Sequence, residues 1–129
     1  MNSTYVHTVA WIDHREAKIL HFNTEDSQLT HVLSHHPDAH IHHKANSGDS
    51  GHALPDNEYL ERVATALGRT GAILITGPAN AKTELMVRLK KSHPDIACHV
   101  SAVESADHPT EGQLLAHGRT FFKVNDRLI

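Results

Sequence analysis

The hydrophobic pattern is strongest in the middle of the chain, over residues 72–89. Residues 72–76 form an unbroken apolar and β-branched run, which is typical of a strand buried on both faces. Gly77 and Pro78 end this strand, because glycine permits unusual backbone angles and proline cannot donate to a sheet hydrogen bond. From about Ala81, leucine and methionine recur at helical spacing. Strand, turn and helix make half of a βαβ unit, so a binding site is expected at this turn.

Shorter strand patterns come before the central run. Residues 6–12 alternate between apolar and polar side chains, as a half-buried strand does, and residues 28–34 alternate in the same way. Residues 17–22 lie between them and carry strand-forming side chains. Because only short polar turns separate the three segments, we expect an antiparallel β-meander.

Further elements flank the central strand and helix. Residues 58–68 are predicted as a helix capped by Asn57, residues 96–103 as a fifth strand, and a last helix begins near Thr110. The predicted order is therefore β-β-β-α-β-α-β-α. This order predicts an α/β fold with a mixed five-stranded sheet, in which an antiparallel meander is followed by βαβ units. We expect a single domain over residues 1–129.

A long loop interrupts this order between residues 35 and 57, where the hydrophobic pattern disappears. Loops longer than about 15 residues in compact domains are usually functional or disordered. The chain has 14 histidines, and a group of them falls in this loop. His35, His40, His42 and His43 are candidate ligands for a zinc or nickel ion. No cysteine joins them and their spacing matches no structural zinc site, so a solvated, RNA-facing or pH-sensitive loop is favoured.

Composition limits the classes of partner. The net charge is −3 with neutral histidines, which does not indicate a DNA-binding protein, so any nucleic-acid contact must come from a local basic patch. The single cysteine, Cys98, suits a reducing cytoplasm. No apolar run reaches membrane-spanning length, and the N-terminus lacks a signal pattern. We therefore expect a cytoplasmic protein without a membrane partner.

The turn after the central strand resembles a phosphate-binding P-loop at first sight. That motif needs a glycine just before its Lys-Thr pair, and here Ala81 takes that place in a loop one residue too short. A nucleotide-hydrolysing site is therefore not expected. Two interpretations remain open. Exposed amides at the helix N-terminus, with Lys82, could hold an RNA phosphate, or Asn80 simply caps the helix while Lys82 is solvated.

A two-metal nuclease site of the ribonuclease-H type is another possible use of the carboxylates in this sequence. Such a site needs several acids gathered around two Mg²⁺ ions. Asp13 would be the first acid and Glu58 or Glu61 the second, but the central strand ends without an acid and the last helix offers only Glu111. No nucleophile-elbow pattern is present either. Glu104, Asp107 and His108 could form a catalytic group, but a helix cap and an exposed turn explain them equally well. We predict no catalytic residues.

Lys82-Thr83-Glu84-Leu85, after an apolar strand and a glycine-containing turn, resembles the middle domain of archaeal and eukaryotic class-one peptide-chain release factors and of Pelota. The predicted element order agrees with that domain and also occurs in ribonuclease-H-like folds. Residues 11–17 and 106–110, among other stretches, are similar to small bacterial relatives described as translational machinery proteins. The resemblance implies the release-factor middle-domain fold and a role in translation.

The same resemblance argues against peptide release. In release factors, the loop before the first helix carries Gly-Gly-Gln, which helps water attack peptidyl-tRNA. Here residues 42–52 lack this triplet, and Gly112-Gln113 lies on the last helix instead. The resemblance therefore implies a non-catalytic protein that binds the ribosome or RNA. Its expected RNA- or anion-binding residues are Lys44, Asn80, Lys82, Thr83, Arg88, Lys90 and Lys91.

Two alternatives stay open. The loop histidines could make the chain a metal-binding protein or a metal-dependent hydrolase, which would bind zinc or nickel as its cofactor. The loop could also mediate pairing in a homodimer.

Overall fold

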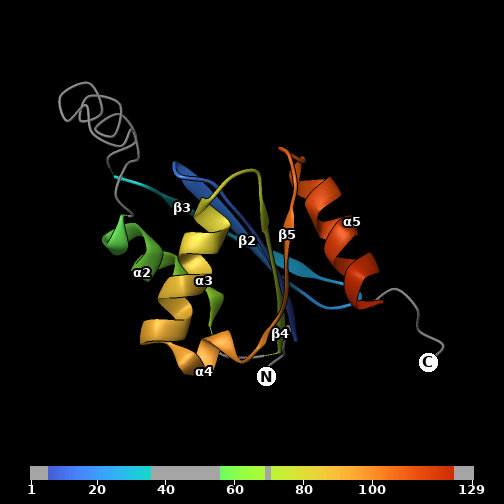
Figure 1. Cartoon of the computed structure of the whole chain (residues 1–129). Helices are drawn as coiled ribbons and strands as arrows, with labels where there is room; N and C mark the ends of the chain where they lie inside the picture. The colour runs from blue at the N-terminus through green and yellow to red at the C-terminus, as the bar shows by residue number, and fades with distance from the viewer. Residues whose placement is uncertain (1–5, 36–55, 69–70, 124–129) are drawn as a thin grey trace.

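The computed structural model describes residues 6–35, 56–68 and 71–123 (Figure 1). Its strands and helices, in chain order, are β1 (His7–Ile12), β2 (Glu16–Phe22), β3 (Ser27–Leu33), α2 (Asn57–Leu67), β4 (Ala72–Gly77), α3 (Ala81–Ser92), α4 (Pro94–Ala97), β5 (Val100–Ser105) and α5 (Glu111–Phe122). The predicted succession of elements is confirmed, and within the described ranges the short helix α4 is added to it. No helix in the described part of the chain is long and apolar enough to span a membrane.

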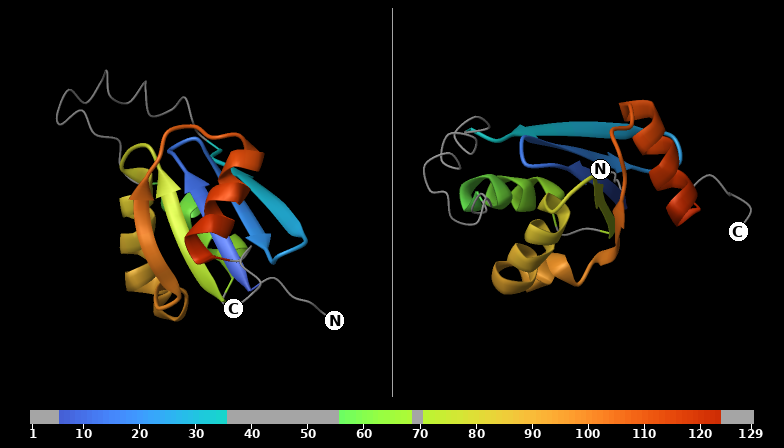
Figure 2. Two further views of the ribbon diagram at one scale, coloured as in Figure 1. Left: turned by 90° about the vertical axis from the view of Figure 1, so that its right-hand side faces the viewer. Right: turned by 45° about the horizontal axis from the view of Figure 1, so that its top comes forward.

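The strands form one mixed sheet in the order β3-β2-β1-β4-β5. The meander β1 to β3 pairs antiparallel, while β4 pairs parallel to β1 on one side and to β5 on the other (Figure 2). The predicted five-stranded sheet is thus confirmed. Because β1 and β4 are central and parallel, their carboxyl ends meet at the same edge of the sheet.

Helices cover both faces of the sheet, with α2 and α3 on one face and α5 on the other (Figure 2). The first core layer includes Ile75 of β4 and Leu85 of α3. The second includes Leu74 of β4 and Leu114 of α5. Residues 6–12 were predicted to be half-buried, and this is wrong: β1 is buried on both faces because α5 covers the side that carries Trp11.

Two predicted boundaries, the start of α2 and the start of β5, differ from those of the structure, and local contacts explain both differences. The cap of α2 is Asp56, whose carboxylate accepts from the backbone N–H of Tyr59 at 3.1 Å, so Asn57 is the first helical residue and not the cap. The fifth strand begins at Val100 instead of residue 96. Pro94 lies in the first turn of α4, where its missing N–H costs nothing, and this short helix takes residues that were assigned to the strand.

Gly77 is required where β4 ends. Its φ is +156°, and a Cβ atom there would lie 2.1 Å from the carbonyl oxygen of Ile12 on β1. Only glycine allows the two parallel strands to stay this close at the edge where the candidate site lies.

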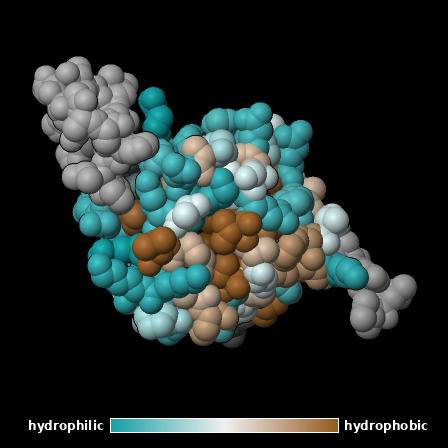
Figure 3. All heavy atoms as spheres, in the orientation of Figure 1, coloured by the Kyte–Doolittle hydropathy of each residue, from teal (hydrophilic) through white to brown (hydrophobic). Residues whose placement is uncertain are grey.

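The surface that α3 and β5 present is mixed in character. Figure 3 shows hydrophobic spheres between hydrophilic ones on this side of the molecule. Val87 of α3 is 59% exposed and Val103 of β5 is 39% exposed. The face is therefore not uniformly charged.

Candidate functional site

The expected RNA- or anion-binding residues on α3 separate into two groups. Thr83, Arg88 and Lys91 line a groove of about 230 Å³ between α2 and α3. The other residues of its lining are Asn57, Leu60, Glu84 and Val87. Lys82 and Lys90 are on the same helix but do not line this groove. The structure thus brings together three of the predicted residues, one turn or two turns apart on α3.

The turn before α3 was predicted either to hold a phosphate or to contain only a helix cap formed by Asn80. Its geometry bears on the cap alone. Asn80 is at the N-cap position with φ −89° and ψ −10°, and its side chain makes no capping hydrogen bond. Asn80 thus occupies the predicted cap position without the side-chain hydrogen bond of a cap. The ammonium of Lys82 donates to the carbonyl oxygen of Ala79 at 2.5 Å and so folds back over the turn. A phosphate contact at this turn stays a prediction.

The two helices that form the groove carry more positive than negative charge. Within α2 and α3 there are five basic and three acidic residues, namely Arg62, Lys82, Arg88, Lys90 and Lys91 against Glu58, Glu61 and Glu84. Arg62 and Arg88 are tied to acids, with Nε to carboxylate distances of 3.1 Å and 2.7 Å. Lys90 and Lys91 have no ion-pair partner among the described residues, so their charges are available to a ligand.

Each acid of these two helices also contacts a histidine. The distances are 3.6 Å for His35–Glu58, 2.8 Å for His93–Glu61 and 3.2 Å for His14–Glu84. The hydrogen bond from His93, followed by that from Arg88, holds the pKa of Glu61 below its ordinary value. All three acids of α2 and α3 are thus already engaged in contacts within the protein.

The chain that follows the histidine-rich loop contributes a residue to this groove. His40, His42, His43 and Lys44 lie outside the described residues, so their roles as metal or RNA ligands stay predictions. The described chain resumes at Asp56, next to Asn57 in the groove. The loop therefore rejoins the fold beside Thr83, Arg88 and Lys91. Within the described ranges, no three acids, histidines or cysteines are grouped so that they could hold a metal ion.

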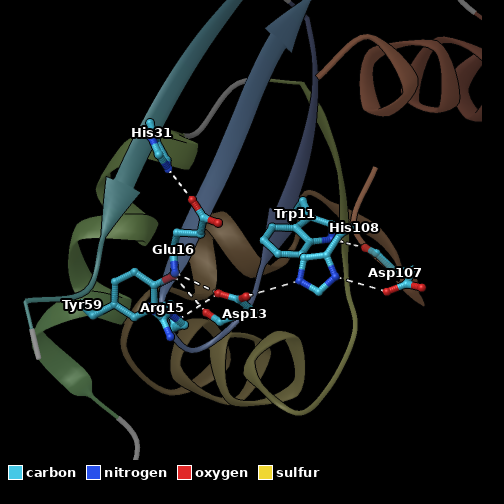
Figure 4. Close-up of polar contacts among 8 residues, drawn as sticks. All are labelled: Trp11, Asp13, Arg15, Glu16, His31, Tyr59, Asp107 and His108. Atoms are coloured by element: carbon cyan, nitrogen blue, oxygen red, sulfur yellow. Dashed lines mark hydrogen bonds and ion pairs between the residues drawn. The ribbon is translucent and has the colours of Figure 1, made fainter. Parts of the chain in front are cut away.

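A second cluster lies at the edge of the sheet where β1 ends (Figure 4). Asp13 Oδ1 accepts from the backbone N–H groups of Arg15 and Glu16 at 2.8 Å and 2.9 Å, which fixes the turn between β1 and β2. The hydroxyl of Tyr59, from α2, donates to the backbone oxygen of Asp13 at 3.0 Å. Burial of this tyrosine, and next the charge of Asp13, raises its pKa. Tyr59 is therefore a structural donor and not an acid–base group.

These contacts also test the nuclease hypothesis. Asp13 holds its own turn, whereas Glu61 is bound by Arg88 and His93 on the helices. Glu58 is bound by Arg62. The three acids are thus used in separate contacts, and the described part of the chain assembles no two-metal site.

Sequence reasoning missed how the loop before α5 closes on this edge. Trp11 Nε1 donates to the backbone oxygen of Asp107 at 2.6 Å, and its ring centroid lies 4.9 Å from that of His108. Figure 4 shows the imidazole of His108 between two carboxylates, with Nδ1 3.1 Å from Asp107 Oδ1 and Nε2 3.7 Å from Asp13 Oδ2. Residues 11–17 and 106–110, which both carried the family resemblance, therefore lie against each other. Trp11, the single tryptophan of the chain, was the one feature of the sequence that could have indicated this contact.

Comparison with known proteins gives the fold. No protein-family model matches the chain, and no curated protein matches it. Among solved structures, Pelota of Thermoplasma acidophilum superposes with a TM-score of 0.64 at 18% identity, over 94% of this chain and 35% of that one. Pelota of Archaeoglobus fulgidus gives 0.61 at 13% identity, over 95% and 33%. The archaeal translation termination factor aRF1 gives 0.60 at 11% identity, over 87% and 32%.

The chain has the fold of part of Pelota and aRF1. The resemblance to release factors and Pelota that the sequence indicated is thus confirmed at the level of the fold. At identities this low, likeness of structure shows the fold alone. The chain spans about a third of the length of these proteins.

Proposed function

We propose that this protein is a non-catalytic, translation-associated protein that binds the ribosome or RNA through the groove between α2 and α3. The observation that carries the proposal is the position of Thr83, Arg88 and Lys91 in one groove, beside the point where the histidine-rich loop rejoins the fold. The fold shared with part of Pelota and aRF1 supports a translation context. Peptide release is not proposed, because the sequence contains no Gly-Gly-Gln triplet.

The groove offers the groups that a phosphate backbone requires. Arg88 is held by Glu61 through Nε, which uses one of the five N–H donors of a guanidinium. Lys91 supplies a point charge, and the Thr83 hydroxyl can donate to a phosphate oxygen. Lys82, Lys90 and the loop residue Lys44 would add further phosphate contacts outside the groove. Such contacts release counterions, so the affinity must fall as salt rises.

The test compares two single-charge variants in binding to purified ribosomal subunits and to transfer RNA across a salt series. Lys91→Ala removes a groove cation, and Lys123→Ala removes a cation just after α5 as the matched control. We expect Lys91→Ala to weaken binding and to lower the slope of log affinity against log salt by about 1. Lys123→Ala should leave both unchanged. Failure of the unmodified protein to bind at low salt, or an equal effect of both variants, would overturn the proposal.

A metal-binding function of the loop is the second candidate, because five histidines lie within residues 35–43, the four candidate ligands among them. His35, the described member of the set, already lies 3.6 Å from Glu58. Metal analysis of the untagged protein separates the two functions. Stoichiometric zinc or nickel that is lost in both His40→Ala and His42→Ala would favour the metal function. Metal-free protein that binds RNA would exclude it.

A further inference from the structure

A second cavity lies on the α5 face of the sheet, on the other side from the groove between α2 and α3. It has a volume of about 420 Å³, which is within the range of small-ligand sites. Its walls come from the carboxyl ends of β4 and β5, the loop that follows β5, and the first half of α5. In parallel sheets, ligands bind at the carboxyl ends of the strands, so the cavity is in the position expected of a site.

The cavity contains a buried polar group that lacks a partner. Thr76 lines it from the end of β4 and is 1% exposed. The Thr76 hydroxyl finds no hydrogen-bond partner among the described residues. A buried hydroxyl without a partner costs free energy, and the cost is recovered when a ligand supplies the missing hydrogen bond.

The remaining polar walls favour a cation. Glu104 and Asp107 are the acids of the lining, and no lysine or arginine is among the described residues that form it. His117 Nε2 lies 2.9 Å from Glu104 Oε1, and in its neutral form it donates to and orients that carboxylate. The Asp107 side chain is 99% exposed and lies 3.1 Å from His108 Nδ1, so Glu104, which is 37% exposed, is the better shielded of the two acids. Two acids without a lysine or arginine among the described lining residues favour a cation over an anion such as a phosphate.

The apolar part of the lining defines the rest of the ligand. Leu114 of α5 is 2% exposed, and Ala106 and Pro109 belong to the loop. These side chains can pack against an aliphatic stem, as the methylene groups of lysine and arginine do in proteins. The cavity thus combines an apolar wall, two carboxylates and the buried Thr76 hydroxyl, which can accept a hydrogen bond.

We propose that this cavity binds an ammonium or guanidinium group carried on an aliphatic stem, with the cation at Glu104 and Asp107 and a donated hydrogen bond to the Thr76 hydroxyl. Such a group can come from a basic side chain of a protein segment or from a free amine. The proposal is independent of RNA binding, because it uses none of the residues of the groove between α2 and α3.

Binding is measured by calorimetry on the full chain at pH 7.5 with L-arginine amide, with L-citrulline amide, whose isosteric side chain is neutral, and with a capped Gly-Arg-Gly peptide. We expect L-arginine amide to bind at least tenfold more tightly than L-citrulline amide. Tighter binding of the peptide than of the amide assigns the site to a protein segment, and equal binding assigns it to a free amine. Equal binding of arginine and citrulline amides, or binding of neither, overturns the proposal.

Three variants test the assigned residues. Glu104→Gln keeps the shape of the side chain and should weaken L-arginine amide binding about tenfold. Glu111→Gln removes an acid at the start of α5 that does not line the cavity, and it should have no effect. Thr76→Val should weaken binding while leaving the thermal midpoint unchanged or raised, since it removes an unpartnered hydroxyl. Unchanged affinity in both Glu104→Gln and Thr76→Val contradicts the proposal, and circular dichroism shows whether each variant is folded.

Discussion

The contact between α5 and the sheet can be tested with one methyl group. Gly118 lies in the buried face of α5, and a Cβ atom there would be 2.9 Å from Val9 Cγ1 and 3.1 Å from the ring of Phe22. Both neighbours are fully buried and neither is the end of a flexible chain. Replacement of Gly118 by alanine therefore forces the helix or the sheet to shift.

Two effects of opposite sign determine how Gly118→Ala changes the free energy of unfolding. Alanine is favoured over glycine in a helix by up to about 1 kcal/mol. Overpacking in a close-packed core costs about 1–3 kcal/mol. At Gly118 both effects act, and we expect a net loss of about 1 kcal/mol. Gly112 is in the same helix and has nothing within 4 Å of its Cβ position, so only the favourable effect acts there.

The assay is urea unfolding of Gly118→Ala and Gly112→Ala, followed by circular dichroism. The two variants should differ in free energy of unfolding by about 1–3 kcal/mol, with Gly118→Ala the less stable. In thermal unfolding this is a difference of at least about 3 °C for a domain of this size. If Gly118→Ala is as stable as Gly112→Ala, α5 is not packed against the sheet as described. The cavity between α5 and the sheet would then lack the wall that α5 provides.

Three other predictions concern single polar contacts. The hydrogen bond from His93 lowers the pKa of Glu61 in the folded state. Ionised Glu61 therefore stabilises the folded protein at pH values above its unfolded pKa of about 4.5. This contribution disappears as the pH falls through the lower folded pKa. Glu61→Gln should therefore cost no more than about 1 kcal/mol in urea unfolding at pH 7 and less at pH 3; equal losses at both pH values would contradict this. Thr110→Ala removes the hydroxyl that caps α5 and should cost about 1 kcal/mol in urea unfolding, more than Thr110→Ser. Tyr59→Phe removes the donor to the Asp13 carbonyl and should cost about 1 kcal/mol in thermal unfolding, whereas no loss would show that water replaces the hydroxyl.

The sequence was sufficient to predict the sheet because its strands have strong local signals. The unbroken apolar run at 72–76 correctly indicated a strand covered on both faces. The alternation at 6–12 was less informative, since Thr8 is as fully buried as Val9. A polar side chain in a β-strand does not reveal whether a distant helix covers it, and α5 is about 100 residues further along the chain. Burial of that face is a tertiary property.

The candidate site was predictable only where its residues share one helix. Thr83, Arg88 and Lys91 lie on the same helix, α3, and the structure places them in one groove. The contact of Trp11 with Asp107 joins residues 96 positions apart, and no periodicity indicates such a pair. The unpartnered hydroxyl of Thr76 was equally hidden, because in sequence it is simply the last side chain of a buried strand.

The two proposed sites differ in charge because the sheet separates the residues that form them. On one face, the helices α2 and α3 carry five basic and three acidic residues, and the groove between them suits an anion. On the other face, the cavity beside α5 has acids but no lysine or arginine among its described lining residues, and it suits a cation. A partner made of nucleic acid alone could occupy the first site only. A ribonucleoprotein offers phosphates and basic side chains together, so occupation of both sites at once would favour the ribosome over free RNA as the partner.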